Sequence, residues 1–153
     1  MKKLSKIIIV LLSFISCSSS QSVESKQIDF EYTILKYNRK EHEDIFKNGS
    51  PTSLTDSEII EIEQIVGNKI RQTIKSHNKD VKTKHKFYRQ YVPVINGMGE
   101  KEVFVQCFAE YYFEDSSWKE YLVRIADGGS SVFSLWVNLN SKTSNGFSIH
   151  GEG

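Results

Sequence analysis

The chain has 153 residues, with 20 Lys or Arg, 19 Asp or Glu and a formal net charge of +1. This length predicts one domain that buries roughly two-thirds of the surface of its unfolded chain. The sequence has no basic stripe, which argues against a nucleic-acid partner. Its 2 cysteines are too few for a disulfide framework.

The N-terminal residues have the pattern of a secretory signal peptide. A basic start is followed by an apolar stretch over residues 7–15, and the small residue Ser16 then precedes Cys17. A membrane-spanning helix needs about 20 apolar residues, and this stretch is shorter. We predict a lipoprotein signal over residues 1–16, cleavage after Ser16 and acylation of Cys17. The alternative is ordinary cleavage within residues 16–20, which leaves a soluble secreted protein.

The same segment predicts where the protein is found. Two or more acyl chains hold a protein stably at a membrane, whereas a single chain holds it only marginally. We therefore expect Cys17 to anchor the protein in the bacterial cell envelope, on the periplasmic or the surface face. Residues 17–27 are polar and rich in Ser, so they are expected to form a flexible tether before a single domain over residues 28–153.

The first element expected in the domain is a half-buried strand. Apolar residues alternate with polar ones from Ile28 to Ile34, which is the period of a strand with one covered face. Residues 39–48 are mostly charged and are expected to form a loop or a short helical turn. The Asn-Gly-Ser-Pro sequence at residues 48–51 ends any regular structure.

The clearest predicted element is a helix that starts after Thr55. Thr55 and Glu58 have the spacing of a capping box, in which each side chain bonds the backbone amide of the other residue. An apolar stripe follows at steps of three and four residues, formed by Ile59, Ile62, Val66, Ile70 and Ile74. Asn78 is the expected end. Because its stripe is β-branched, this helix needs a sheet to lie against.

Successive strands separated by turns account for the rest of the chain. We expect strands over residues 86–95, 103–112, 118–126, 132–139 and 147–149, with turns at residues 96–99, 127–129 and 140–146. Pro93 suggests that its strand lies at an edge or ends there. The predicted fold is α+β, with one long amphipathic helix packed on a curved antiparallel β-meander of four to five strands.

Side-chain alternation assigns the two faces of these strands. One face is expected to pack on the helix and carries Phe133, Leu135, Val137 and Leu139. On the opposite face we predict a concave aromatic surface that binds a ligand or partner, formed by Phe104, Gln106, Phe108 and Trp136. Ser134 is expected to be a polar guide there, and Tyr121 a further aromatic member. The alternative is that a neighbouring segment covers these aromatic residues as ordinary core.

No catalytic, metal or cofactor motif stands out. The four histidines (His42, His77, His85 and His150) are scattered, and no pair has the spacing of a zinc-protease motif. The charged segment at residues 41–44 is interpreted as a solvated face, and His150 with Glu152 as at most an adventitious metal site. No nucleophile with its base can be selected, and no phosphate-binding glycine motif occurs. Cys107 lies in an apolar strand and is expected to be a buried, unpaired thiol.

Several motifs resemble those of small, uncharacterised bacterial envelope lipoproteins. They are Leu54-Thr55 with Glu58-Ile59, Arg89-Gln90-Tyr91, the segment 99–103, Asp127-Gly128-Gly129, Val137-Asn138-Leu139 and Gly151. The resemblance spans roughly residues 30–153 and rests on a cap, turns and strands. It implies an envelope lipoprotein but transfers no catalytic residue. A helix followed by an antiparallel meander is also similar to cystatin-like and NTF2-like domains, which is an analogy of architecture only.

Together these features favour a non-enzymatic, lipid-anchored domain that binds a ligand or a protein partner. Two alternatives remain open. One is a hydrolase-like enzyme with an unfamiliar site in the concavity of the sheet. The other is an inhibitor or immunity-type protein, which would bind an enzyme.

Overall fold

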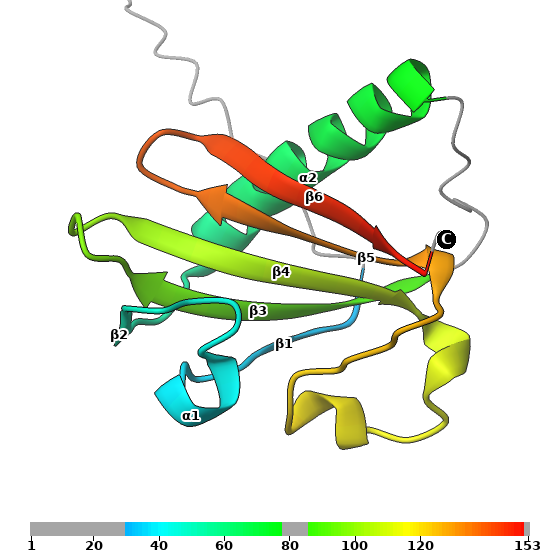
Figure 1. Cartoon of the computed structure of the whole chain (residues 1–153), viewed down its shortest axis with the longest axis horizontal. Coiled ribbons are helices and arrows are strands. Elements are labelled where there is room, and N and C mark those ends of the chain that lie inside the picture. The colour runs from blue at the N-terminus through cyan, green and yellow to red at the C-terminus, as the bar shows by residue number, and fades with distance from the viewer. Residues whose placement is uncertain (1–29, 78–85, 152–153) are drawn as a thin grey trace, which may run out of the picture.

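The computed structural model describes residues 30–77 and 86–151. The predicted signal peptide, the lipidation site at Cys17 and the tether lie outside these residues, as do Asn78 and His85. In chain order the elements are β1 (Tyr32–Ile34), α1 (Arg39–His42), β2 (Ser50–Pro51), α2 (Asp56–His77), β3 (Phe87–Ile95), β4 (Lys101–Ala109), η1 (Glu110–Tyr112), η2 (Ser117–Lys119), β5 (Gly129–Asn138) and β6 (Thr143–His150). Figure 1 shows their arrangement.

The strands form a six-stranded sheet in the order β1-β3-β4-β5-β6, with β2 also paired to β3. Strands β3 to β6 pair antiparallel in chain order, and one long helix accompanies the sheet, so the predicted mixture of helix and sheet is confirmed. The sheet has six strands where four to five were predicted, and the uniformly antiparallel pairing is wrong, because β1 pairs with β3 in parallel. The chain between these two strands contains α1, β2 and α2, and a connection of that length lets a strand return in the same direction.

Pro93 neither ends its strand nor places it at an edge of the sheet. On one side of β3, β1 pairs with residues 89–91 and β2 pairs with residues 94 and 95. The backbone groups of Tyr91 point to that side, because its carbonyl accepts a hydrogen bond from the Leu35 amide. The backbone of Pro93, two residues later, points the same way. Pro93 therefore lies between the two short strands, where its missing N–H costs no ladder hydrogen bond.

Helix α2 begins at the predicted capping box. The Thr55 amide donates to Glu58 Oε2 at 2.8 Å, and the Glu58 amide donates to Thr55 Oγ1 at 3.3 Å. Glu58 also forms an ion pair of 2.6 Å with Lys101 at the start of β4. The same carboxylate therefore caps the helix and ties its first turn to the sheet.

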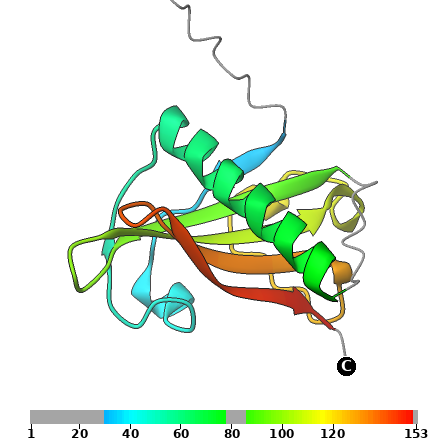
Figure 2. The same ribbon diagram turned by 90° about the horizontal axis from the view of Figure 1, so that it is seen from above.

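The apolar stripe of α2 packs on one face of the sheet from Ile59 to Ile70, as predicted, and the side chain of Ile74 lies outside the described part of the helix. Ile59, Ile62 and Val66 are at most 1% exposed and lie in one cluster with Phe133, Leu135 and Val137 of β5. Figures 1 and 2 show the helix running obliquely across this face, beside β5 and β6. Each buried aliphatic side chain contributes about 1.5–3 kcal/mol, which makes this the main apolar interface of the fold.

Polar groups add a second link between α2 and the sheet. Both Glu63 carboxylate oxygens lie 3.3 Å from Arg89 Nε, and the Tyr91 hydroxyl donates to Glu63 Oε1 at 2.9 Å. Burial raises the pKa of Tyr91 well above its ordinary value, so the phenol stays protonated and donates. Cys107 lies on the same face, fully buried and unpaired as predicted, and burial raises its thiol pKa to about 12.

Three predicted strands differ from those observed. The strand predicted over residues 103–112 ends at Ala109, and residues 110–112 form η1. Residues 118–126 form no strand. They form an irregular segment that starts in η2, because three of its backbone groups bond the Gln90 side chain of β3. Asp127-Gly128-Gly129 is therefore the entry into β5 and not a hairpin turn. β6 begins at Thr143 instead of residue 147, since its first residues are polar and only their pairing with β5 defines them as a strand.

Candidate ligand cavity

A row of polar residues crosses the face of the sheet opposite α2. The strand registers align Thr33, Gln90, Gln106, Ser134 and Ser148 on five neighbouring strands. Gln90, Gln106 and Ser134 are at most 4% exposed. Buried polar side chains are almost always hydrogen-bonded, so each of them is expected to have a partner.

Apolar clusters lie on either side of this polar row. One contains Leu35, Tyr37, Phe46, Val92, Val94 and Phe104, and the other contains Phe108, Trp118, Val123 and Val132. The segments that supply their outer layers are residues 35–46, around α1, and residues 118–125, which start in η2. The second face of the sheet is thus covered, and the polar row lies between the two covering segments.

Gln90 is fully satisfied by one of these segments. Its amide nitrogen donates to the carbonyls of Trp118 and Tyr121, the latter at 2.7 Å, and its amide oxygen accepts from the Val123 amide at 2.8 Å. Three backbone groups of an irregular segment therefore find their partners on one strand residue. This explains why residues 118–126 cover the sheet without joining it.

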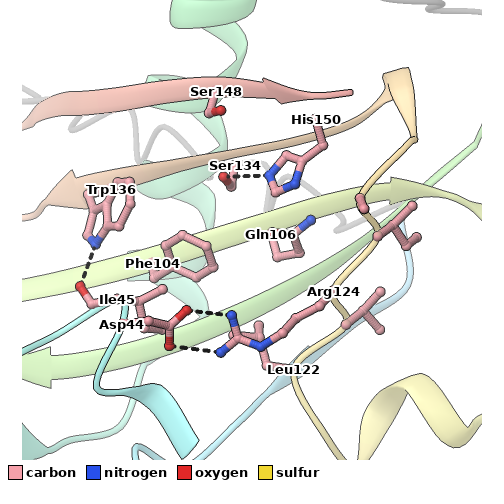
Figure 3. Close-up of a pocket in the computed structure, with 13 residues that line it drawn as sticks. Asp44, Ile45, Phe104, Gln106, Leu122, Arg124, Ser134, Trp136, Ser148 and His150 are labelled. Carbon is pink, nitrogen blue, oxygen red and sulfur yellow. Dashed lines mark hydrogen bonds and ion pairs between the residues drawn. The ribbon is translucent and has the colours of Figure 1, made fainter. Parts of the chain in front are cut away.

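Over the next part of the polar row the covering segments leave a cavity of about 420 Å³. Its apolar wall includes Phe104, Trp136, Ile45 and Leu122, and its polar wall includes Gln106, Ser134, Ser148 and His150. Figure 3 shows these side chains converging from β4, β5, β6 and the two covering segments. Pockets that hold small molecules have volumes of roughly 300–1,000 Å³, so this one has the size of a ligand site.

Trp136 forms a firmly held part of the apolar wall. Its indole nitrogen donates to the Ile45 carbonyl at 3.1 Å, and its ring packs at an angle of 62° on Phe104, with 4.9 Å between centroids. Gly146 lies against the other side of the ring, with a φ of +60° and so little room that a Cβ atom would be 2.5 Å from Trp136 Cε3. A glycine is required there both by conformation and by the close approach.

An ion pair joins the two covering segments at the cavity. Arg124 donates from both terminal nitrogens to the Asp44 carboxylate and also to the Glu41 carbonyl, as the dashed lines to Asp44 in Figure 3 indicate. The hydrogen bonds from Arg124 lower the pKa of Asp44 below its ordinary value. Both side chains are about half exposed, so the pair contributes little to stability by itself. Its consequence is that the two charges compensate each other at this side of the cavity.

Gln106 differs from Gln90 in that its amide nitrogen has no partner. Within residues 30–77 and 86–151, Gln106 Nε2 is the buried side-chain nitrogen or oxygen without a hydrogen bond. In Figure 3 the Gln106 side chain lies in the cavity between Ser134 and Arg124, with no dashed line to either. An unpaired buried donor costs about 1–3 kcal/mol, so a fold retains one where something else accepts its hydrogen.

Ser134 and His150 form the other polar pair of the cavity. Ser134 Oγ and His150 Nε2 lie 3.0 Å apart. Ser148 and His150 share a face of β6, and an irregular register between Gly129 and Phe133 brings His150 beside Ser134. The pairing directs the hydroxyl and the imidazole toward one point of the cavity wall (Figure 3).

The structure brings together three of the four residues predicted for the aromatic surface. Phe104, Gln106 and Trp136 line the cavity, as does the predicted polar guide Ser134. Phe108 does not, because it is fully buried beneath Trp118 in the second apolar cluster. Tyr121 is half exposed and contributes its carbonyl to Gln90 rather than its ring to the cavity.

Sequence reasoning missed the residues that the covering segments and β6 supply, chiefly Asp44, Ile45, Arg124 and His150. For His150 a signal exists, because it alternates with Ile149 on the final strand and so shares the face of Ser148. The others lie in irregular segments, where no periodicity indicates which way a side chain points.

The interpretation of residues 41–44 as a solvated face is wrong for His42. This side chain is 3% exposed, and its Nδ1 accepts a hydrogen bond from the Asn38 amide at 3.1 Å. Burial lowers the pKa of His42 below 6.5. Among the residues that the structure describes, no group of three or more acidic, His or Cys side chains is placed to hold a metal ion. Nor does any helix in this part of the chain have the length and apolar character to cross a bilayer.

Comparison with protein-family models, curated proteins and solved structures finds no match for this chain.

Proposed function

We propose that the protein is a lipid-anchored domain of the bacterial envelope, related to the small lipoproteins it resembles, that binds a small molecule or a side chain of a protein partner in the cavity. The anchor is proposed from the sequence of residues 1–17. The binding role rests chiefly on one observation, which is the unpaired amide of Gln106 in a cavity with an aromatic wall. The face of the sheet opposite α2 is then the binding side.

The composition of the cavity supports binding. Ligand sites are mostly apolar concavities with a few convergent polar groups. Here Phe104 and Trp136 supply a preformed apolar wall, and Gln106, Ser134 and His150 supply the polar groups. Because contacts on both sides hold the Trp136 ring, this side chain loses little conformational entropy when a ligand binds.

Native purification tests this proposal. The full chain is isolated from its own membranes, and compounds and proteins that co-purify are identified by mass spectrometry. We expect enrichment with the natural chain and loss with Trp136→Ala, which removes the wall. Met98→Ala is the matched control, because Met98 is a large exposed apolar residue, 79% accessible, in the turn between β3 and β4 and outside the lining of the cavity. Equal recovery with Trp136→Ala would contradict the proposal.

A second candidate function is hydrolysis, favoured by the contact between Ser134 and His150. A distance of 3.0 Å between Oγ and Nε2 is within the range for a nucleophile and its base. In that case Ser134 Oγ attacks an ester carbonyl while His150 takes the hydroxyl proton and passes it to the leaving alcohol. Water then releases the acid and restores the serine, and in this reaction Gln106 Nε2 would donate to the carbonyl oxygen.

Covalent labelling separates this candidate from simple binding. A fluorophosphonate probe is expected to modify Ser134 if His150 activates it, and Ser134→Ala and His150→Gln are each expected to remove the label. A chain that binds ligand but takes up no label, and whose purified form hydrolyses no ester, is a binding domain.

A further inference from the structure

The polar end of the cavity presents hydrogen-bond donors. Gln106 Nε2 has no partner within the described residues, and it is a donor with no acceptor capacity. One hydrogen bond joins Ser134 Oγ and His150 Nε2. If the hydroxyl donates it, the neutral ring carries its own hydrogen on Nδ1. If the ring donates it, the hydroxyl hydrogen remains available. Ser148 adds a hydroxyl from β6. A ligand that satisfies Gln106 has to supply an acceptor.

The charges around the cavity favour an acceptor without a formal charge. Asp44, Arg124 and His150 are its titratable lining residues. Arg124 is already engaged by both oxygens of Asp44 and by the Glu41 carbonyl. Because Asp44 compensates the charge of Arg124, a bound carboxylate would give up its hydration for a weakened attraction, which is unfavourable. A carbonyl oxygen gives Gln106 its partner at lower cost.

The apolar end determines the rest of the ligand. Phe104 and Trp136 meet edge to face and form an aromatic wall, and Ile45 and Leu122 extend it from the two covering segments. Aromatic side chains arranged in this way pack well against another ring or a branched aliphatic group. The ligand therefore needs an apolar body directly beside its acceptor oxygen.

We propose that the cavity binds an uncharged carbonyl compound, an amide or ester with an apolar body, whose oxygen accepts from Gln106 Nε2 and whose body packs on Phe104 and Trp136. This proposal rests on the proposed binding function and specifies its ligand. It applies equally if Ser134 proves to be a nucleophile, because the same oxygen position then belongs to the substrate.

Three probes that share one body test the chemical class. Phenylacetamide carries a neutral carbonyl, phenylacetate an anionic one and 2-phenylethylamine a cationic donor. Each is titrated to millimolar concentration against the full chain, and the side-chain amide signal of Gln106 and the indole signal of Trp136 are followed by NMR. Phenylacetamide is expected to shift both signals and to bind roughly tenfold more tightly than phenylacetate, with no saturable shift from the amine. Tighter binding of the acid or of the amine, or no shift from any probe, overturns the proposal.

Two variants distinguish this proposal from the binding function itself. Gln106→Leu removes the unpaired donor and is expected to lose phenylacetamide binding while keeping or raising the unfolding midpoint. Gln90→Leu is the matched control, because it removes the same side chain one strand away but with three bonds to the fold. If the probe binds equally well to Gln106→Leu, the carbonyl assignment fails and the binding function stands. If Gln106→Leu destabilises the chain as much as Gln90→Leu does, the Gln106 amide stabilises the fold, through a hydrogen bond to an ordered water. That result overturns the proposal.

Discussion

Gln90 and Gln106 face one another on adjacent strands of the same sheet, and only one of them is satisfied. Both are at most 2% exposed and are direct cross-strand partners. Gln90 binds three backbone groups of residues 118–123, whereas Gln106 Nε2 binds none of the described residues. The glutamine amide on β3 thus holds residues 118–123 against the sheet, whereas the glutamine amide on β4 faces the cavity.

The first prediction concerns the structural member of this pair. Gln90→Leu leaves two carbonyls and the Val123 amide without partners, so we expect a loss of about 3 kcal/mol in the free energy of unfolding. Most of the lost stability should concern residues 118–123, whose backbone groups Gln90 bonds. Urea denaturation measures the energy, and hydrogen exchange at the Val123 amide should accelerate. Gln106→Leu is the control, and an unchanged exchange rate in Gln90→Leu would show that the segment is held by other contacts.

The second prediction is a pH dependence that arises from His42. Nδ1 can accept from the Asn38 amide only while it carries no proton. Burial lowers the pKa of His42 from 6.5, with Glu41 and Asp44 opposing the shift and Arg124 adding to it. Below pH 6.5 the unfolded chain therefore binds a proton more readily than the folded one, and the free energy of unfolding should fall as the pH is lowered through that window.

Denaturation of the natural chain and of His42→Gln between about pH 7 and about pH 5 checks the origin of this dependence. The variant should lose the part of the slope that lies just below pH 6.5. Because residues 35–46 form one wall of the cavity, probe binding should weaken over the same range. Identical slopes in the two chains would assign the effect to other groups.

The third prediction concerns the ion pair between α2 and the sheet. Arg89 and Glu63 side chains are only 12% and 19% exposed, and Tyr91 also bonds Glu63. Arg89→Met leaves the carboxylate without its cation in a largely buried site, which should cost about 3 kcal/mol. The double variant Arg89→Met with Glu63→Met removes both charges and should recover much of that loss. Thermal or chemical denaturation of both variants measures the difference, and a double variant no more stable than the single one would contradict this explanation.

The fourth prediction concerns the anchor. Cells fed labelled palmitate should incorporate it into the natural chain and not into Cys17→Ser, and the variant should leave the membrane fraction. Cys107→Ser is the control, since that thiol is buried in the fold. Probe binding should be the same in all three chains if the domain folds independently of the anchor. An unlabelled natural chain would indicate a secreted protein instead.

Features that depend on residues close together in the chain could be predicted from the sequence. The capping box of Thr55 and Glu58, the apolar stripe of α2 and the alternation that puts Phe133, Leu135 and Val137 toward the helix all act over a few residues. The same alternation placed Phe104, Gln106 and Trp136 together on the other face. These features could therefore be predicted before any tertiary structure was known.

Which of these residues have partners depends on contacts between segments that are far apart in the chain. The parallel pairing of β1, the irregular path of residues 118–126 and the burial of Phe108 under Trp118 depend on segments distant in the chain. Whether an inward amide is saturated, as at Gln90, or left to face a cavity, as at Gln106, depends on which backbone passes over it. Hydrogen bonds act over about 3 Å, so a pattern of residue types, which fixes faces but not neighbours, does not contain that information.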